Sequence, residues 1–212
     1  MNQRTAAGVP PALLRRPIRL LRPRDALDVY ADPRHEFARL HRLGLLQRVA
    51  TGYFVIVAPD RIGDPNWRPP LVATAWAVAA IDYGVDAVAV CGPSAARHHG
   101  LIPRELATAF VAVPKQRPRL KLAGGEACYV RRDVTRLDLE RWAGDLGAGW
   151  VTTLEQTVLD LATRPNRWEL PDSDLHDAVR AARPRLQDDL LEQLAHEQRK
   201  VSVLARIEQL AS

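Results

Sequence analysis

The sequence predicts an α+β protein, in which an N-terminal winged helix-turn-helix precedes a larger α+β domain with a small sheet and C-terminal helices. Three observations support this prediction. Residues 22–57 have the pattern of two short helices and a two-stranded ribbon, short apolar runs recur between residues 85 and 151, and residues 171–212 show helical periodicity. A proline-rich stretch, residues 58–70, lies between the first part and the rest, so we place the domains at residues 1–66 and 67–212.

The second helix of the N-terminal domain carries the stronger signals. Asp32 can accept a hydrogen bond at the N-cap, and Pro33 follows at a position where a missing N–H costs little. Phe37 and Leu40 are three residues apart and therefore share the inward side of the helix, to which Leu43 is expected to add, while Gly44 is suited to end it. The remaining positions are rich in arginine and histidine, which predicts a cationic outer face.

The flanking elements complete the module. Pro23 is suited to begin a first helix that turns Leu27 inward, and a tight turn then leads to the second helix. Residues 45–49 and 53–57 are β-prone runs joined by three residues ending in Gly52, where a positive φ is wanted. This hairpin is the predicted wing.

Charge is concentrated in this part of the chain. Residues 1–70 contain 12 Arg, no Lys and 6 acidic residues, a balance of +6, whereas residues 71–212 balance to −1. Positive charge gathered on one module attracts phosphate at long range, which favours nucleic-acid binding. The alternative is a purely structural helix-hairpin unit whose arginines are solvated. The chain has 27 Arg and only 3 Lys, so the placement of the charge is more informative than the kind of cation.

The second part of the chain contains motifs that can be read as capping signals. An alanine-rich helix over residues 71–82 and a buried strand over residues 85–91 are followed by Ser94, which can cap a short helix that Gly100 closes. Thr153 and Gln156 then have capping-box spacing. Further strands are predicted at 110–113, 120–122, 128–131 and 150–151. Helices are predicted at 152–161 and in three segments after residue 171. On the first of these helices, Asp160 is expected to pair with Arg164 on the exposed face.

Composition excludes several other classes. No apolar run approaches the ~20 residues of a membrane span and no apolar leader is present, so we expect a cytoplasmic protein with no membrane partner. Cys91 and Cys128 lie in apolar runs and are expected to be free thiols. A zinc site that combines both cysteines with His98 and His99 is the alternative, although neither CxxC nor HxxxH spacing is present.

An enzyme is not favoured. A nuclease of the D/E-x-K type needs an acid two residues before its lysine, but Val113, Arg119 and Gln198 stand two positions before the three lysines. The phosphate-binding glycine motifs and the G-x-S-x-G motif are also missing. We therefore expect no catalytic residues, no cofactor and no metal.

Three motifs, taken in order, resemble the AbiEi antitoxins, the partners of nucleotidyltransferase toxins in bacterial type IV toxin–antitoxin pairs. The motifs are GLLxRxxxGYF at residues 44–54, SAxxxHGL at 94–101 and TxxEQTxLDL at 152–161, so the likeness extends over nearly the whole chain. It implies a repressor that binds double-stranded DNA at its own operator and also counteracts its toxin. Some relatives carry more Lys and Gly in the wing, whereas this wing is short and nearly neutral at its tip.

The resemblance also implies where DNA is contacted. The second helix would contribute Arg34, His35, Arg39 and Arg42, the wing would contribute Arg48 and Thr51, and the phosphate anchors would be Arg15, Arg16, Arg19, Arg22 and Arg24. Two alternatives of other classes stay open: a stand-alone regulator that senses a small ligand, and an enzyme that acts on DNA or modifies the toxin.

Overall fold

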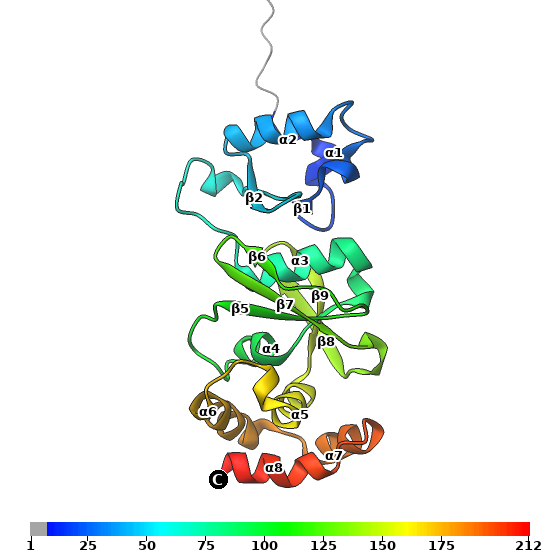
Figure 1. Ribbon diagram of the computed structural model, residues 1–212, viewed down its shortest axis with the longest axis vertical. Coiled ribbons are helices and arrows are strands. Elements are labelled where there is room, and N and C mark those ends of the chain that lie inside the picture. Colours follow the sequence, from blue (N-terminus) through cyan, green and yellow to red (C-terminus); the bar gives the residue numbers. More distant parts are fainter. Residues whose placement is uncertain (1–7) are drawn as a thin grey trace, which may run out of the picture.

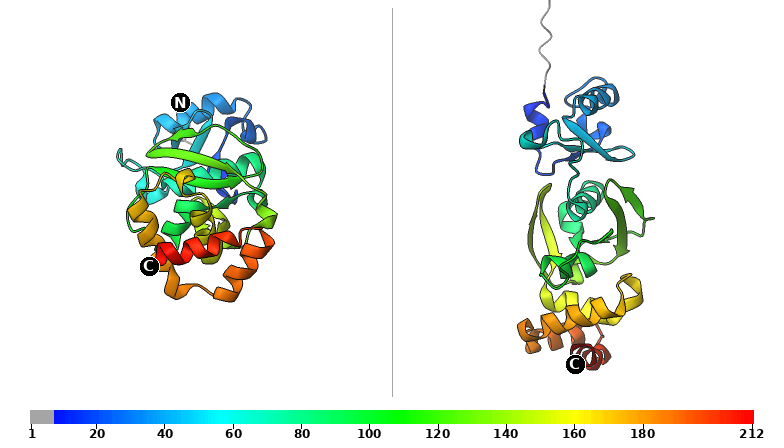
Figure 2. Two further views of the ribbon diagram at one scale, coloured as in Figure 1. Left: turned by 60° about the horizontal axis from the view of Figure 1, so that its bottom comes forward. Right: turned by 90° about the vertical axis from the view of Figure 1, so that its left-hand side faces the viewer.

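The computed structural model describes residues 8–212, which stack in three layers along the long axis of the molecule (Figure 1). A small N-terminal unit forms one end, a six-stranded sheet forms the middle, and helices form the other end. Figure 2 shows the same order of layers from two further directions. The mixture of helices and strands confirms the α+β prediction.

The N-terminal unit is built from two helices and a three-stranded antiparallel sheet. Its elements are α1 (Pro11–Leu14), β1 (Leu20–Leu21), α2 (Pro33–Arg42), β2 (Leu46–Ala50) and β3 (Tyr53–Ile56), with strand order β1-β3-β2. Phe37 and Leu40 of α2 are fully buried, together with Leu13 of α1. The inward face predicted for this helix is confirmed for Phe37 and Leu40 but wrong for Leu43, which is 48% exposed because the helix ends before it, at Arg42. Gly44 follows with a φ of 71°.

The helix predicted to begin at Pro23 is wrong in extent. Only a single 3-10 turn forms, Pro23–Ala26, and the chain then continues as hydrogen-bonded turns up to Tyr30. Leu27 was expected on the inner face, but it is 69% exposed. Successive side chains in a 3-10 turn point in directions about 120° apart. Ala26 is therefore buried while its neighbour Leu27 remains at the surface.

The middle layer begins with α3 (Leu71–Tyr83) and contains one mixed sheet of order β6-β7-β5-β4-β9-β8. Its strands are β4 (Ala89–Val90), β5 (Thr108–Val113), β6 (Leu120–Leu122), β7 (Gly125–Arg131), β8 (Leu139–Gly144) and β9 (Gly147–Thr152). The β5–β7 and β4–β9 pairs are parallel and the others are antiparallel. Strand β8 was not predicted, and the strand predicted over residues 85–91 is reduced to two residues after a 3-10 turn.

Both faces of this sheet are covered, as the central strand β5 shows. Ala109, Val111 and Val113 join the cluster that contains α3, whereas Phe110 and Ala112 join the cluster on the opposite face. Side chains alternate between the two faces of a strand, so a continuous apolar run is what a doubly covered strand requires. The opposite face is packed by α4 (Gly92–His98) and α5 (Leu154–Thr163).

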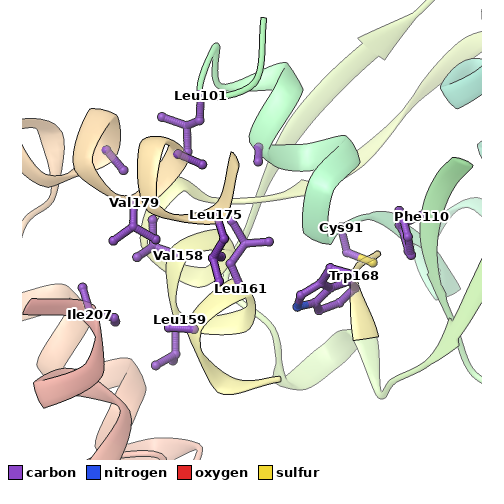
Figure 3. Close-up of a cluster of buried hydrophobic side chains, with 14 of the residues drawn as sticks. Cys91, Leu101, Phe110, Val158, Leu159, Leu161, Trp168, Leu175, Val179 and Ile207 are labelled. Atoms are coloured by element: carbon purple, nitrogen blue, oxygen red, sulfur yellow. The ribbon is translucent and has the colours of Figure 1, made fainter. Parts of the chain in front are cut away.

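The third layer consists of α6 (Asp172–Ala182), α7 (Asp188–Glu197) and α8 (Ser202–Ala211), which cover α5. Figure 3 shows Val158, Leu159 and Leu161 of α5 packed among side chains of this layer, including Leu175, Val179 and Ile207. The three helices predicted after residue 171 are thus confirmed. No helix within residues 8–212 has the length and apolar character needed to cross a bilayer.

The N-terminal unit and the middle layer share a hydrophobic core. Leu20 and Val55 of the small sheet belong to the same buried cluster as Trp76 of α3. Polar contacts reinforce this junction, because the Asp82 carboxylate of α3 accepts hydrogen bonds from Arg22 and from the Tyr53 hydroxyl, the latter at 2.7 Å. The junction is therefore packed, and the exact boundary at residue 66 stays a prediction.

Candidate functional site

The outer face of α2 carries several cationic side chains. Asp32 caps the helix by accepting the His35 N–H at 3.1 Å, which fixes where the helical turn begins. At 100° per residue, His35 and Arg42 lie opposite the buried side of the helix and Arg34 lies on its flank, and all three are exposed. Neither Arg34 nor Arg42 forms an ion pair with any described residue. Their guanidinium groups are therefore open to solvent and to a ligand.

Arg39 differs from its neighbours on the helix. It is only partly exposed, and its Nε donates to the Glu36 carboxylate at 2.9 Å. A carboxylate one turn away neutralises part of its charge, so Arg39 is less available to phosphate than Arg34 or Arg42.

The turn between β2 and β3 lies beside the start of α2. Gly52 has a φ of 81°, as predicted for this turn, and Arg48 donates to the Thr51 hydroxyl at 3.3 Å. A hollow of about 560 Å³ separates the turn from the helix, and its lining includes Arg24, Arg34 and Thr51. Residues predicted from three separate segments thus border one concave surface.

The upstream arginines divide into two groups. Arg15 and Arg19 are exposed, Arg24 is exposed and lies 3.7 Å from the Asp82 carboxylate, and Arg16 is more covered and pairs with the exposed Asp28 at 3.0 Å. Arg22 is different, because its side chain is 14% exposed and pairs with both Asp25 and Asp82. Its charge is already compensated inside the junction, so the structure places Arg22 among the residues that hold the two parts of the chain together.

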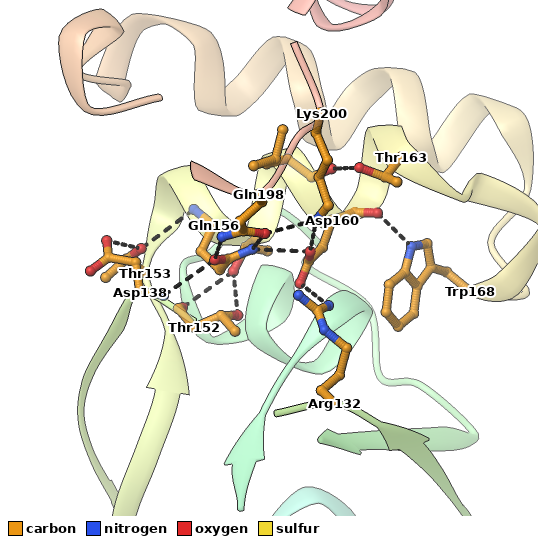
Figure 4. A network of polar contacts seen from close by, with 12 residues as sticks. Arg132, Asp138, Thr152, Thr153, Gln156, Asp160, Thr163, Trp168, Gln198 and Lys200 are labelled. Carbon is orange, nitrogen blue, oxygen red and sulfur yellow. Dashed lines mark hydrogen bonds and ion pairs between the residues drawn. The ribbon is translucent and has the colours of Figure 1, made fainter. Parts of the chain in front are cut away.

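A second polar centre lies in the C-terminal half, around Asp160 of α5 (Figure 4). The carboxylate is 1% exposed and accepts from Arg132 at 2.8 Å, from Lys200 at 3.1 Å and from the Gln156 amide at 3.0 Å. Burial lowers the pKa of Lys200, and Asp160 partly opposes this effect. The predicted pairing of Asp160 with Arg164 on an exposed face is therefore wrong, since Asp160 faces inward.

Two of the capping predictions are also corrected. Ser94 does not cap α4; its buried hydroxyl accepts the N–H of Phe110 on β5 at 2.8 Å and thereby ties the helix to the sheet. Thr153 caps α5 as predicted, by accepting the Gln156 N–H at 3.4 Å. The Gln156 side chain does not complete a capping box, because it is bound to Asp138, Asp160 and Gln198. The predicted closure of α4 at Gly100, with φ 76°, is confirmed.

The cysteines form neither a disulfide nor a metal site. Both are free, and burial raises the pKa of Cys91 to about 12, so its thiol is unreactive at neutral pH. Among the residues that the structure describes, the group with metal-ligand geometry is His98, His99 and Glu140, which contains no cysteine. The zinc alternative based on both cysteines is therefore wrong.

Comparison with known proteins identifies the family. The family model of the AbiEi antitoxin C-terminal domain matches residues 88–212, more than half of the chain. The chain belongs to the AbiEi antitoxin family. This AbiEi protein matches no curated protein. Among solved structures it is similar to the crystal structure of the RV2827C protein from Mycobacterium tuberculosis, with a TM-score of 0.59 and 19% identity over 94% of this chain and 77% of that one. That likeness supports the fold alone.

Membership of the AbiEi family establishes an antitoxin and transcription-regulator role in general terms. The region matched by the family model, residues 88–212, includes the Asp160 centre. Sequence reasoning missed that Arg132 and Lys200 belong to this centre, because they lie 28 and 40 residues from Asp160. No local signal pointed to a buried charge, because Asp160 shares its side of the helix with the polar residues Gln156 and Thr157, a pattern typical of an exposed face.

Proposed function

We propose that this AbiEi protein is a type IV antitoxin that represses its own operon by binding operator DNA and that counteracts a nucleotidyltransferase-type toxin. The observation that carries the DNA-binding part is the cationic outer face of α2, where Arg34, His35 and Arg42 are exposed beside the β2–β3 turn. Helix-turn-helix proteins insert such a helix into the major groove.

The topology supports a winged helix-turn-helix. A helix, a strand, two helical segments and a hairpin follow one another, and the first strand pairs with the last to give the order β1-β3-β2. In this proposal α2, the helix that precedes the hairpin, is the recognition helix of the winged module. Arg48 and Thr51 of the turn then reach the duplex next to the helix, and Arg15, Arg16, Arg19 and Arg24 serve as phosphate anchors.

The roles of the arginines differ by their surroundings. Arg34 and Arg42 are the base readers in this proposal, since their charges are uncompensated, and Arg39 contributes less because Glu36 holds it. Arg22 is left out of the interface because Asp25 and Asp82 already bind it.

The test is a fluorescence-anisotropy titration of full-length protein with an operator fragment and with unrelated DNA. Arg34→Ala or Arg42→Ala should weaken operator binding by about 1–3 kcal/mol each, since each removes a contact to a base edge. Arg16→Ala should weaken binding to both DNAs equally and reduce the salt slope by about one charge. Arg206→Ala, on α8, is the matched control and should change nothing. Unchanged operator affinity in folded Arg34 and Arg42 variants would remove α2 as the reader.

The antitoxin part is tested by co-expressing the full chain with the product of the adjacent gene. We expect growth to be restored, and a pull-down then shows whether restoration needs direct contact. Continued growth arrest counts against a toxin partnership and favours the second candidate, a regulator that senses a small ligand. The feature that favours this second candidate is the cationic cavity described next.

A further inference from the structure

A cavity in the C-terminal half has a strongly positive lining. It has a volume of about 400 Å³ and lies between the end of β7, the end of α5 and the link from α7 to α8. Six cationic side chains line it: Arg131, Arg132, Arg136, Arg164, Arg167 and Lys200. Two acids, Asp133 and Asp160, are also present, which leaves the lining at +4. Its volume lies in the range of small-molecule sites.

The charges divide into a fixed floor and an open rim. Asp160 is the floor, and it engages Arg132 and Lys200, whose side chains are 17% and 19% exposed. Lys200 reaches this position because Arg199, at φ 56°, reverses the chain after α7. The three side chains of the floor are therefore held together by ion pairs, and their charges sum to +1.

The rim of the cavity carries positive charges that have no ion-pair partner among residues 8–212. Arg131, Arg136, Arg164 and Arg167 are exposed, and within residues 8–212 none of them forms an ion pair. Asp133 offsets one of these charges, but its carboxylate accepts the N–H and the hydroxyl of Thr135 and forms no ion pair with the four arginines. Four like charges around one hollow repel each other, and an anion placed between them removes that repulsion.

The kind of cation indicates the kind of anion. A guanidinium group offers a planar pair of donors that matches phosphate oxygens, and each such contact is charge-assisted. Four arginines match an anion of three to four charges, which exceeds what a single phosphate or a carboxylate supplies. We propose that this cavity binds the di- or triphosphate group of a small ligand, either as inorganic polyphosphate or on a nucleoside.

The cavity is separate from the proposed DNA interface. It adjoins α5 and the α7–α8 link, whereas α2 lies in the layer at the other end of the molecule (Figure 1). Ligand binding in the cavity is therefore independent of operator binding by α2.

The experiment is isothermal titration calorimetry of the full-length protein at low salt, with sodium tripolyphosphate and with guanosine triphosphate as the two probes. The double variant Arg164→Gln/Arg167→Gln should lose about tenfold or more in affinity for both probes, because it removes half of the rim charge. The control Arg180→Gln/Arg206→Gln removes the same charge from α6 and α8, outside the cavity, and should bind like the wild type. Operator binding should be unchanged in both variants, so the result is distinct from failure of the DNA-binding proposal.

The two probes separate the two sources. Equal affinities mean that the phosphates alone are recognised, and tighter binding of guanosine triphosphate means that the cavity also contacts the nucleoside; either result supports the site. Absence of binding by the wild type overturns the proposal. Equal losses in the cavity and control variants also overturn it, because the binding would then follow net charge alone.

Discussion

Replacing Asp160 by asparagine should destabilise the protein more than any loss of a surface ion pair. The carboxylate is 1% exposed and faces two cations, Arg132 and Lys200, which are each less than one-fifth exposed. Breaking a buried ion pair on one side costs about 3–5 kcal/mol, because the partner charge is left uncompensated. Both cations line the cavity and stay partly exposed, so the lower end of this range, about 3 kcal/mol, applies here.

Equilibrium urea unfolding measures this loss. Asp174→Asn is the matched control, since Asp174 pairs with a half-exposed arginine, Arg104, and its loss should cost less than about 1 kcal/mol. The double variant Asp160→Asn/Lys200→Met should regain part of the stability, because it removes one stranded cation. If Asp160→Asn costs no more than Asp174→Asn, the Asp160 centre is not a buried ionic network and the reasoning is refuted.

Two further outcomes concern packing and pH. Gly92→Ala should destabilise the fold by more than Gly100→Ala: both positions have a positive φ, but a Cβ at Gly92 would lie 2.5 Å from the Trp168 ring whereas a Cβ at Gly100 meets open space. Comparison of the two melting temperatures checks this, and equal losses would mean that backbone strain alone is at work. Burial raises the pKa of Cys91 from 9.0 to about 12, so the folded protein retains this proton when the unfolded chain has lost it. The stability that this thiol contributes is fully present below pH 9 and is lost as pH rises toward 12. Unfolding at pH 8 and pH 10.5 should show a larger loss in the wild type than in Cys91→Ala, and parallel losses would contradict it.

Local signals in the sequence were sufficient for much of the fold. The cap at Asp32, the apolar spacing of Phe37 and Leu40 and the closing glycine at Gly100 each act within a few residues, and the structure has them as predicted. The same is true of Thr153 at the start of α5. These features depend on the chain's own neighbours, which a single sequence displays.

Features that depend on distant partners were not predictable in the same way. Ser94 looked like a cap, but its hydroxyl is used by Phe110, sixteen residues further on. Strand β8 carries a weak alternation of its own and is fixed mainly by its ladder with β9. At the candidate DNA interface, the exposed arginines of α2 followed from helical spacing, whereas the capture of Arg22 by Asp82, sixty residues away, could not be foreseen.

The shared core between the small sheet and α3 determines how this chain can be divided. A fragment that starts at residue 71 would remove Leu20 and Val55 from the buried cluster that contains Trp76. It would also leave Asp82 with Arg117 as its one remaining ion-pair partner. Truncation therefore exposes apolar surface that is buried in the intact chain and removes two of the cations that pair with Asp82. Heating the intact chain should accordingly give a single calorimetric peak, in which both ends of the molecule melt together.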